Sequence, residues 1–179
     1  MTINKNMFTA FLALAIAFSS CMNDAGKTND EPVQNSGSVS ATESNDAKQL
    51  PLLNMVNEKG EPVSLNSFQG KKIFVNLWAS WCGPCRREMP SIEKLYRSVD
   101  TAKVAFVLLA LDDDFEKSKK YMASQKLNLP LYYPAENLPA LFNVPGIPTT
   151  FIFGEQGQLI QKIEGSDDYD RDEYRKILK

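Results

Sequence analysis

The chain has 179 residues, 43% of them hydrophobic and 23% charged, which suits one globular domain with tails and excludes a collagenous, repetitive or largely disordered protein. Its 20 basic residues against 22 acidic ones leave a formal net charge of −2, so no basic surface indicates a nucleic-acid partner. The absence of histidine excludes Ser–His and Cys–His catalysis and metal or haem sites that need an imidazole.

The first 20 residues have the layout of a secretory signal. Lys5 precedes an apolar run over residues 7–18, and two serines then lead to Cys21. The run is shorter than the roughly 20 residues that span a bilayer, so a transmembrane helix is the weaker interpretation. The Phe-Ser-Ser-Cys ending resembles a bacterial lipobox, although Phe18 stands where an aliphatic residue is usual. We therefore predict a lipoprotein signal peptide and lipidation of Cys21, the alternative being a secreted protein with a free thiol.

Residues 21–49 are predicted to form the lipidated N-terminus and a disordered tether. The stretch is polar and rich in turn-forming residues, so it cannot bury enough apolar surface to offset its ordering entropy. A flexible coil of this length has a reach of about 30 Å. The segment would hold a folded domain, residues 50–179, away from a bacterial membrane and within the cell envelope. A fused or truncated peptide without a role is the alternative.

The pattern of residues 50–179 predicts an α/β domain. Its expected elements, in chain order, are a short strand pair before and around Val63–Leu65, a buried strand over 73–78, a helix over 85–99, a buried strand over 104–109, a helix over 115–126, a hairpin of 149–153 with 158–163, and a helix over 169–178. This order predicts a mixed central β-sheet with helices on both faces.

The chemistry is concentrated in Trp81-Cys82-Gly83-Pro84-Cys85, between a strand and a helix. The spacing puts Cys82 at the helix start and Cys85 one turn later on the same face. Unpaired N–H groups at a helix N-terminus stabilise a thiolate. We therefore expect an exposed nucleophilic Cys82 and a protected Cys85, with Cys82 attacking a partner disulfide and Cys85 breaking the resulting mixed disulfide. The redox-active pair would itself replace a cofactor.

Two other interpretations of the cysteine pair remain. It could be half of a zinc site, but the sequence offers neither a second Cys-x-x-Cys pair nor a histidine to complete one, and we expect no metal. It could also be a structural disulfide, which would not require the flanking tryptophan, the Gly-Pro bridge or the position at a helix start.

Together with Gly146-Ile147-Pro148-Thr149-Thr150, about 60 residues further on, this motif resembles the thioredoxin superfamily. The fuller likeness, over most of residues 52–179, is to its membrane-tethered TlpA-like and ResA-like thiol-disulfide oxidoreductases. The resemblance implies a thioredoxin fold with an N-terminal β-hairpin extension and a cis-proline at Pro148 that faces the cysteines. The implied substrate groove consists of Trp81, Gly83, Pro84, Gly146, Ile147 and Pro148.

A cis bond before Pro148 is also plausible on physical grounds. An X-Pro bond adopts cis at a cost of only about 0.5–1 kcal/mol. Because proline has no N–H, the backbone of Ile147 would stay free to pair with an extended substrate peptide. A proline that merely begins a strand is the alternative.

Glu88 is the candidate proton-handling group. Cytoplasmic thioredoxins carry a buried aspartate six residues before the first cysteine, where this chain has Asn76, which cannot titrate. Glu88 follows Cys85 by three residues and shares its helical face, and the Cys-x-x-Cys-x-x-Glu spacing resembles the ResA-like pattern. A carboxyl buried beside thiols should have a raised pKa and exchange protons near neutrality. The alternative is a surface glutamate paired with a nearby arginine or lysine.

Two other groups of residues are interpreted as structural. Pro90 is expected to kink the first long helix, and the acidic run 112–114 to cap the next helix rather than hold a cation. Trp78 is expected in the core and Trp81 half-exposed at the rim of the site.

The predicted function is that of an extracytoplasmic thiol-disulfide oxidoreductase. The Gly-Pro dipeptide and the glutamate resemble the reducing branch, which implies protein disulfides as substrates, a membrane electron donor and, by family likeness alone, a role in cytochrome c maturation. The alternatives are a disulfide oxidase or isomerase, and a tethered peptide-binding module without catalysis.

Overall fold

The computed structural model describes residues 48–179, so the predicted signal, Cys21 and nearly all of the tether lie outside the described residues. Within residues 48–179, no helix has both the length and the apolar character needed to cross a bilayer. The elements are β1 (Asn54–Asn57), β2 (Pro62–Ser64), the 3-10 helix η2 (Leu65–Phe68), β3 (Lys72–Trp78), α1 (Gly83–Ser98), β4 (Val104–Ala110), α2 (Phe115–Ser124), β5 (Leu131–Pro134), the 3-10 helix η3 (Ala140–Phe142), β6 (Thr149–Phe153), β7 (Leu159–Glu164) and α3 (Asp172–Ile177).

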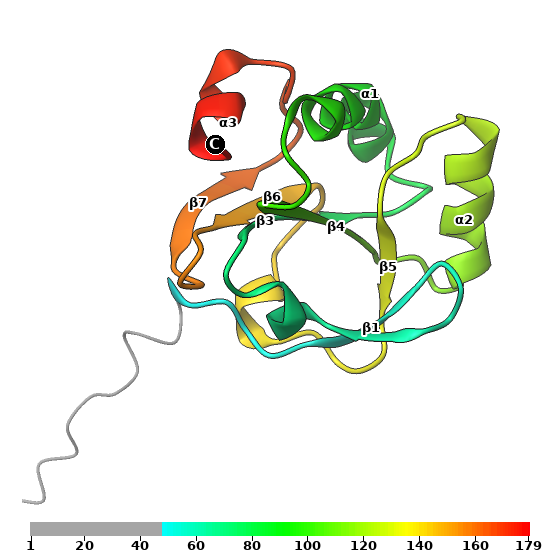
Figure 1. Cartoon of the computed structure of the whole chain (residues 1–179). Helices are drawn as coiled ribbons and strands as arrows, with labels where there is room; N and C mark the ends of the chain where they lie inside the picture. Colours follow the sequence, from blue (N-terminus) through cyan, green and yellow to red (C-terminus); the bar gives the residue numbers. More distant parts are fainter. Residues whose placement is uncertain (1–47) are drawn as a thin grey trace, which may run out of the picture. The chain divides into compact units, whose positions relative to one another are not determined.

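Seven strands form one mixed sheet in the order β2-β1-β5-β4-β3-β6-β7 (Figure 1). The central strands β3, β4 and β5 are parallel, whereas β6 runs antiparallel to β3 and β1 runs antiparallel to β5. The predicted α/β class, the N-terminal hairpin and the β6–β7 hairpin are confirmed. Strand β5, which was not predicted, extends the parallel part of the sheet.

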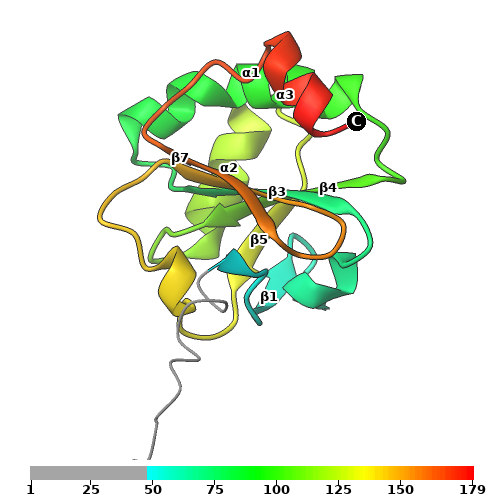
Figure 2. The same cartoon turned by 90° about the vertical axis from the view of Figure 1, so that its left-hand side faces the viewer.

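The sheet is covered on both faces, by different kinds of element (Figure 2). Side chains of α1, α2 and α3 pack together over one face, and η2, η3 and the segment around β1 pack over the other. The crossovers β3–α1–β4 and β4–α2–β5 step in the same direction along the sheet. Since such crossovers are right-handed, they bring α1 and α2 to the same face.

Strand β3 fixes which side chains point toward α1. Every residue of β3 after Lys72 is buried, as expected for a strand packed on both faces. Phe74 and Trp78 belong to the core beneath the α-helices, whereas Val75 and Leu77 belong to the core on the other face. Asn76 lies between Phe74 and Trp78 in this alternation, so its amide points into the helix-covered core.

Helix α1 positions the cysteine motif. Its N-cap is Cys82, and Pro84 in the first turn has no N–H that would need a partner. The helix continues through Pro90, which leaves the carbonyl of Arg86 without its intrahelical donor. One face of the helix is buried, in the spacing of three and four predicted from the sequence: Cys85, Glu88, Met89, Ile92 and Leu95.

Two predicted features differ in detail. The last helix is shorter than predicted, because Tyr169 precedes it in a loop whose Asp168 carboxylate accepts from the Asp170 N–H. In the acidic run 112–114, Asp114 caps α2 as predicted, but Asp112 is buried and bonded elsewhere.

Candidate active site

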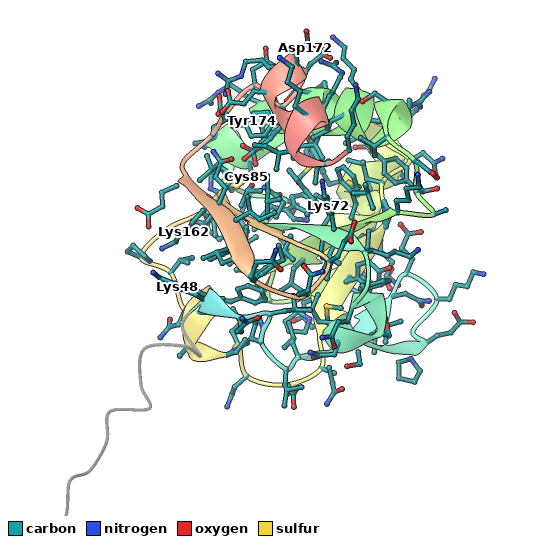
Figure 3. All side chains as sticks on the ribbon, turned by 60° about the vertical axis from the view of Figure 1, so that its left-hand side comes forward. Lys48, Lys72, Cys85, Lys162, Asp172 and Tyr174 are labelled. Carbon is teal, nitrogen blue, oxygen red and sulfur yellow. A yellow bond between two sulfur atoms is a disulfide. The ribbon has the colours of Figure 1, made fainter. Side chains whose placement is uncertain are left out.

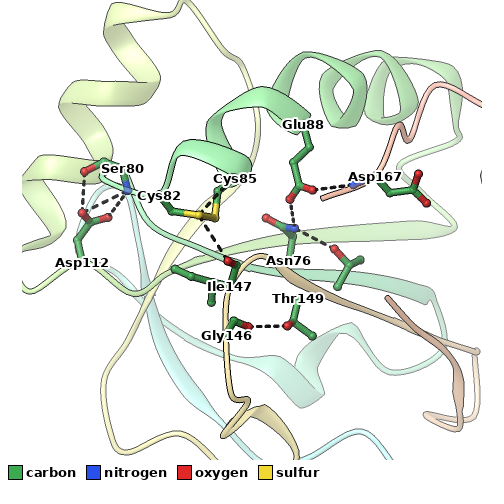
Figure 4. Close-up of a disulfide and its surroundings, with 11 residues drawn as sticks. Asn76, Ser80, Cys82, Cys85, Glu88, Asp112, Gly146, Ile147, Thr149 and Asp167 are labelled. Atoms are coloured by element: carbon green, nitrogen blue, oxygen red, sulfur yellow. Dashed lines mark hydrogen bonds between the residues drawn. A yellow bond between two sulfur atoms is a disulfide. The ribbon is translucent and has the colours of Figure 1, made fainter. Parts of the chain in front are cut away.

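Cys82 and Cys85 form a disulfide at the N-terminus of α1 (Figure 4). The Cys85 N–H donates to Cys82 Sγ over 3.2 Å, so the sulfur serves as the cap of the helix. Cys85 is fully buried, and Figure 3 shows it within the packed interior. Cys82 is only 4% exposed, so the prediction of an exposed Cys82 is wrong for the oxidised protein. The order of accessibility is nevertheless the predicted one, with Cys82 outermost.

The loop before β6 lies directly against this disulfide. The Ile147–Pro148 bond is cis, as predicted, and the Ile147 carbonyl oxygen is 3.7 Å from Cys82 Sγ. The loop is fixed on both sides, because Thr149 Oγ1 donates to the Gly146 carbonyl and the Gly165 N–H donates to the Pro148 carbonyl. Two segments separated by about 60 residues are thereby brought together around one sulfur atom.

The surface around the cysteines combines an apolar rim with a shallow hollow. On the α1 side, Gly83 and Pro84 are exposed and Trp81 is 68% exposed, which is more than the half-exposure predicted. On the other side, the residues that line the hollow are Pro145, Gly146, Ile147, Pro148, Thr149, Glu164 and Gly165. The six predicted groove residues therefore come from the two segments that meet at the disulfide.

Glu88 is buried beneath α1, with 2% of its surface exposed. Its Oε1 accepts from Asn76 Nδ2 over 2.8 Å and its Oε2 accepts from the Asp167 N–H over 3.3 Å. Burial raises the pKa of Glu88 from its ordinary value of 4.5 to about 7, although the hydrogen bonds from Asn76, Asp167 and Ser166 oppose the rise. The alternative of a surface glutamate paired with a cation is therefore wrong.

A polar network that the sequence did not reveal supports Glu88. Asn76 Nδ2 also donates to Thr150 Oγ1 over 2.9 Å, and the Tyr169 hydroxyl donates to the same oxygen over 2.7 Å. Asn76, Thr150 and Tyr169 are fully buried. Asn76 and Thr150 are direct partners across β3 and β6, and only knowledge of that register could have paired them.

Asp112 was also missed as part of the site. Its carboxylate accepts from the Ser80 N–H, from Ser80 Oγ over 2.6 Å and from the Ser118 hydroxyl. These bonds tie the loop before Trp81 to α2. The sequence signal for this role was the position of Asp112 directly after a buried strand, which we interpreted as helix capping.

The arrangement supplies thiol–disulfide chemistry from the chain itself. A vicinal cysteine pair carries two electrons as dithiol or disulfide. Across residues 48–179, no three His, Cys, Asp or Glu side chains are grouped to hold a metal ion.

Residues 37–178 match the Redoxin family over most of the chain. The chain belongs to this family. It is 36% identical over 120 residues to the thioredoxin-like protein YneN of Bacillus subtilis, covering 66% of this chain and 70% of that protein. It is 29% identical over 119 residues to the thiol-disulfide oxidoreductase ResA of Bacillus thuringiensis, covering 66% and 69%. The predicted resemblance to ResA-like proteins is confirmed, and the chain is a thiol-disulfide oxidoreductase.

Solved structures agree on the fold. The thioredoxin domain of a Bacteroides vulgatus thiol-disulfide oxidoreductase superposes with a TM-score of 0.64 at 23% identity, covering 74% of this chain and 97% of that one. A thiol:disulfide interchange protein of the thioredoxin family from Chlorobium tepidum gives a TM-score of 0.63 at 28% identity, covering 73% and 93%. The thioredoxin fold is thus shown.

The raised pKa of Glu88 predicts a pH-dependent stability. Between about pH 4.5 and 7 the folded protein keeps a proton on Glu88 that the unfolded chain has released, so the free energy of unfolding falls as pH rises. The difference between 4.5 and about 7 corresponds to about 3 kcal/mol. In urea denaturation of the oxidised protein, wild type should lose about this much more stability than Glu88→Gln between pH 4.5 and pH 8. Equal losses in both proteins would contradict a buried, titrating Glu88.

Proposed function

We propose that the protein reduces disulfides in other proteins of the bacterial cell envelope, with Cys82 as nucleophile and Cys85 as resolving thiol. The observation that carries this proposal is the single Cys82 sulfur that both caps α1 and contacts the cis-proline loop. The capping N–H groups favour the Cys82 thiolate over the thiol. Since Cys85 is completely buried, a partner protein reaches Cys82 first.

In the first step, the Cys82 thiolate attacks one sulfur of a substrate disulfide, and the other substrate sulfur leaves as a thiolate. In the second step, the Cys85 thiol gives its proton to Glu88 and attacks Cys82 Sγ in the mixed disulfide. The Cys82–Cys85 disulfide forms, and the remaining substrate sulfur leaves. Two electrons pass to the substrate, so a membrane electron donor must reduce the pair again.

Glu88 suits the second step because of its surroundings. Burial raises its pKa to about 7, so it changes protonation state near neutral pH. It lies one turn after Cys85 on the buried face of α1. In this position the carboxylate can accept the Cys85 proton without exposure of the thiolate to water.

The substrate would lie as an extended segment between Trp81 and the cis-proline loop. Pro148 has no N–H, and the hollow beside it is lined by Gly146 and Ile147. Exposed Trp81, together with Gly83 and Pro84, offers apolar contact on the opposite side of Cys82. Backbone pairing of this kind accepts many sequences, which suits an enzyme with several protein substrates.

The reducing direction rests on the Gly83-Pro84 dipeptide and on Glu88, which resemble the reducing ResA-like branch. Reduction of apocytochrome c cysteines is one task that this likeness suggests. A disulfide oxidase or isomerase remains the enzymatic alternative, and a tethered peptide-binding module the non-catalytic one. A reduction potential below about −200 mV would support the reductase, and one well above it the oxidase.

The proposed location rests on the signal-like residues 1–20 and on Cys21. A lipid on Cys21 would anchor the chain, and the polar segment up to residue 49 would let the domain reach its partners. Stable anchoring needs more than one acyl chain, as bacterial lipoprotein modification supplies.

Trapping tests the function and its direction. Cys85→Ser should accumulate mixed disulfides at Cys82, because the second step is blocked while the first continues. Non-reducing gels and mass spectrometry of the captured proteins would identify the substrates. Cys82→Ser should capture none. Full biological function in the double variant Cys82→Ser, Cys85→Ser would instead support the non-catalytic binding module.

Replacement of Glu88 tests the proton step. Glu88→Gln keeps the size of the side chain but cannot accept the Cys85 proton, so resolution of a preformed mixed disulfide should slow by about 100-fold near pH 7. Stopped-flow release of a chromophoric thiol measures this rate. Glu93→Gln, on the same helix, is the matched control and should resolve at the wild-type rate. Wild-type kinetics in Glu88→Gln would remove Glu88 from the mechanism.

Removal of Cys21 tests the anchor. In cells labelled with a palmitate analogue, the wild-type chain should take up label and partition into the membrane fraction. Cys21→Ser should do neither, because the acylated sulfur is gone. If Cys21→Ser remained in the membrane fraction, another means of attachment would have to replace the lipid.

A further inference from the structure

The Asn76 amide holds an unusual position in the core. Its side chain is fully buried, and Nδ2 donates to both Glu88 Oε1 and Thr150 Oγ1. Its Oδ1 is also buried, yet it has no hydrogen-bond partner in the structure. A buried amide oxygen without a donor is costly, so this orientation persists only if the two bonds from Nδ2 outweigh the loss.

An ionised Glu88 would account for this orientation. An ionised carboxylate only accepts hydrogen bonds, so the amide must present Nδ2 to Glu88 and turn Oδ1 away. Figure 4 shows Asn76 beneath Glu88, with its oxygen on the side of the disulfide. Cys85 precedes Glu88 by one turn on the same buried face of α1. The unpaired Oδ1 therefore faces the part of the core where Cys85 lies.

Protonation of Glu88 reverses the preference. A protonated carboxyl has an O–H donor, and the Thr150 hydroxyl also has a hydrogen to donate. Rotation of the Asn76 amide by 180° would place Oδ1 where Nδ2 now lies, so that it accepts from both groups. Tyr169 can still donate to Thr150 Oγ1, as it does now. The rotated Nδ2 would occupy the present place of Oδ1, on the side of Cys85.

We propose that Asn76 is a proton-coupled amide switch that donates to ionised Glu88 in one orientation and, once Glu88 holds the Cys85 proton, rotates to accept from Glu88 and donate to the Cys85 sulfur. Asn76 is then a positioning residue, because it acts on the proton step through Glu88. The proposal rests on the proposed function only in making Glu88 the acceptor of the Cys85 proton. No atom is consumed, since the proton passes from Cys85 Sγ to a Glu88 oxygen and the amide merely turns.

The rotation of Asn76 would stabilise the Cys85 thiolate during the second step of the reaction. The Cys85 thiolate forms inside a dry core, where an unpaired charge is strongly disfavoured. A donor that turns toward the sulfur as the proton leaves would stabilise the thiolate before it attacks Cys82. The same rotation gives the buried Oδ1 hydrogen-bond donors, so it is no longer unpaired.

The groups that face Glu88 define what else could titrate with it. Asp167 approaches from the segment after β7, where its N–H donates to Glu88 and its negative charge raises the pKa of Glu88. The Asp167 carboxylate is itself paired with Arg171. Tyr169 stays protonated, because burial raises the pKa of its hydroxyl. Ser166 and Asn76 are neutral, so Glu88 is the one of these groups expected to change charge near pH 7, and in the reduced protein the Cys85 thiol on the same face of α1 is the other titratable neighbour.

NMR of the reduced full chain tests the switch without any substrate. Above the Glu88 midpoint, the Asn76 Hδ2 protons should show nuclear Overhauser contacts to Thr150. Below the midpoint they should show contacts to the Cys85 Hβ protons, with the same pH midpoint as the Glu88 carboxyl. Contacts to Thr150 at every pH would overturn the proposal. Glu88→Gln should lock the rotated form, because a Gln amide that accepts from Asp167 can only donate toward Asn76. Persistent Thr150 contacts in Glu88→Gln would likewise overturn it.

Kinetics of a variant provide the second readout. Asn76→Leu removes both ends of the amide, so Cys85 should resolve a mixed disulfide about tenfold more slowly, with a shifted pH profile. Attack by Cys82 should change less than twofold. The matched control is Asn66→Leu, which also replaces an asparagine with a buried unpaired oxygen, but in η2. Asn76→Leu with the wild-type pH profile would count against the switch. If the wild-type protein did not exchange thiols with a substrate, the proposed function would be refuted. The amide switch would still be tested separately, because the NMR contacts of Asn76 are measured without substrate.

Discussion

The site depends on the way α1 begins. Most helices take an oxygen from Ser, Thr, Asp or Asn at the N-cap, whereas here a cysteine sulfur accepts the first free N–H. The bond that starts the helix is therefore also the bond that favours a thiolate on Cys82. Because α1 packs against the sheet along its whole buried face, the cysteine pair is held by the core rather than by a flexible loop. The Cys82 sulfur therefore contributes both to the stability of α1 and to the reactivity of the site.

The buried polar groups follow from the same packing. Strand β3 alternates between its two faces, so Asn76 points toward α1 among aromatic side chains, and Glu88 points back from the helix. Neither group can reach water, so each needs the other, together with Thr150 and Tyr169. The raised pKa of Glu88 is a consequence of this placement. A buried carboxyl of this kind costs stability when it is ionised, and the proposed proton transfer from Cys85 would account for its presence.

The sequence was informative wherever local pattern decides structure. The apolar run of β3, the three-and-four spacing of α1 and the residue types at 82–85 were enough to predict the fold class and the redox pair, whereas the cis-proline was predicted through the family resemblance of residues 146–150. The network behind Glu88 could not be predicted, because Thr150 and Tyr169 reach it only through sheet register and chain return. The role of Asp112 was interpreted wrongly for a similar reason. Asp112 follows β4 and its partner Ser80 follows β3, so only the pairing of these two strands brings them together. Strand β5 could not be predicted, because it is only four residues long and ends in proline, so its hydrophobic pattern was too short to indicate a strand.

Access to the disulfide is the last constraint, and it bears on which partners can react. Cys82 is 4% exposed, and the Ile147 carbonyl stands 3.7 Å from its sulfur. Thiol–disulfide exchange needs the attacking, attacked and leaving sulfurs nearly in line. A broad, folded surface of a partner protein could not bring its disulfide into this alignment with the buried Cys82 sulfur. A narrow, extended segment would have room to enter between exposed Trp81 and the cis-proline loop, which the Thr149–Gly146 hydrogen bond holds in place. For the proposed reductase, the burial of Cys82 would therefore favour disulfides in exposed or unfolded segments over disulfides within folded domains.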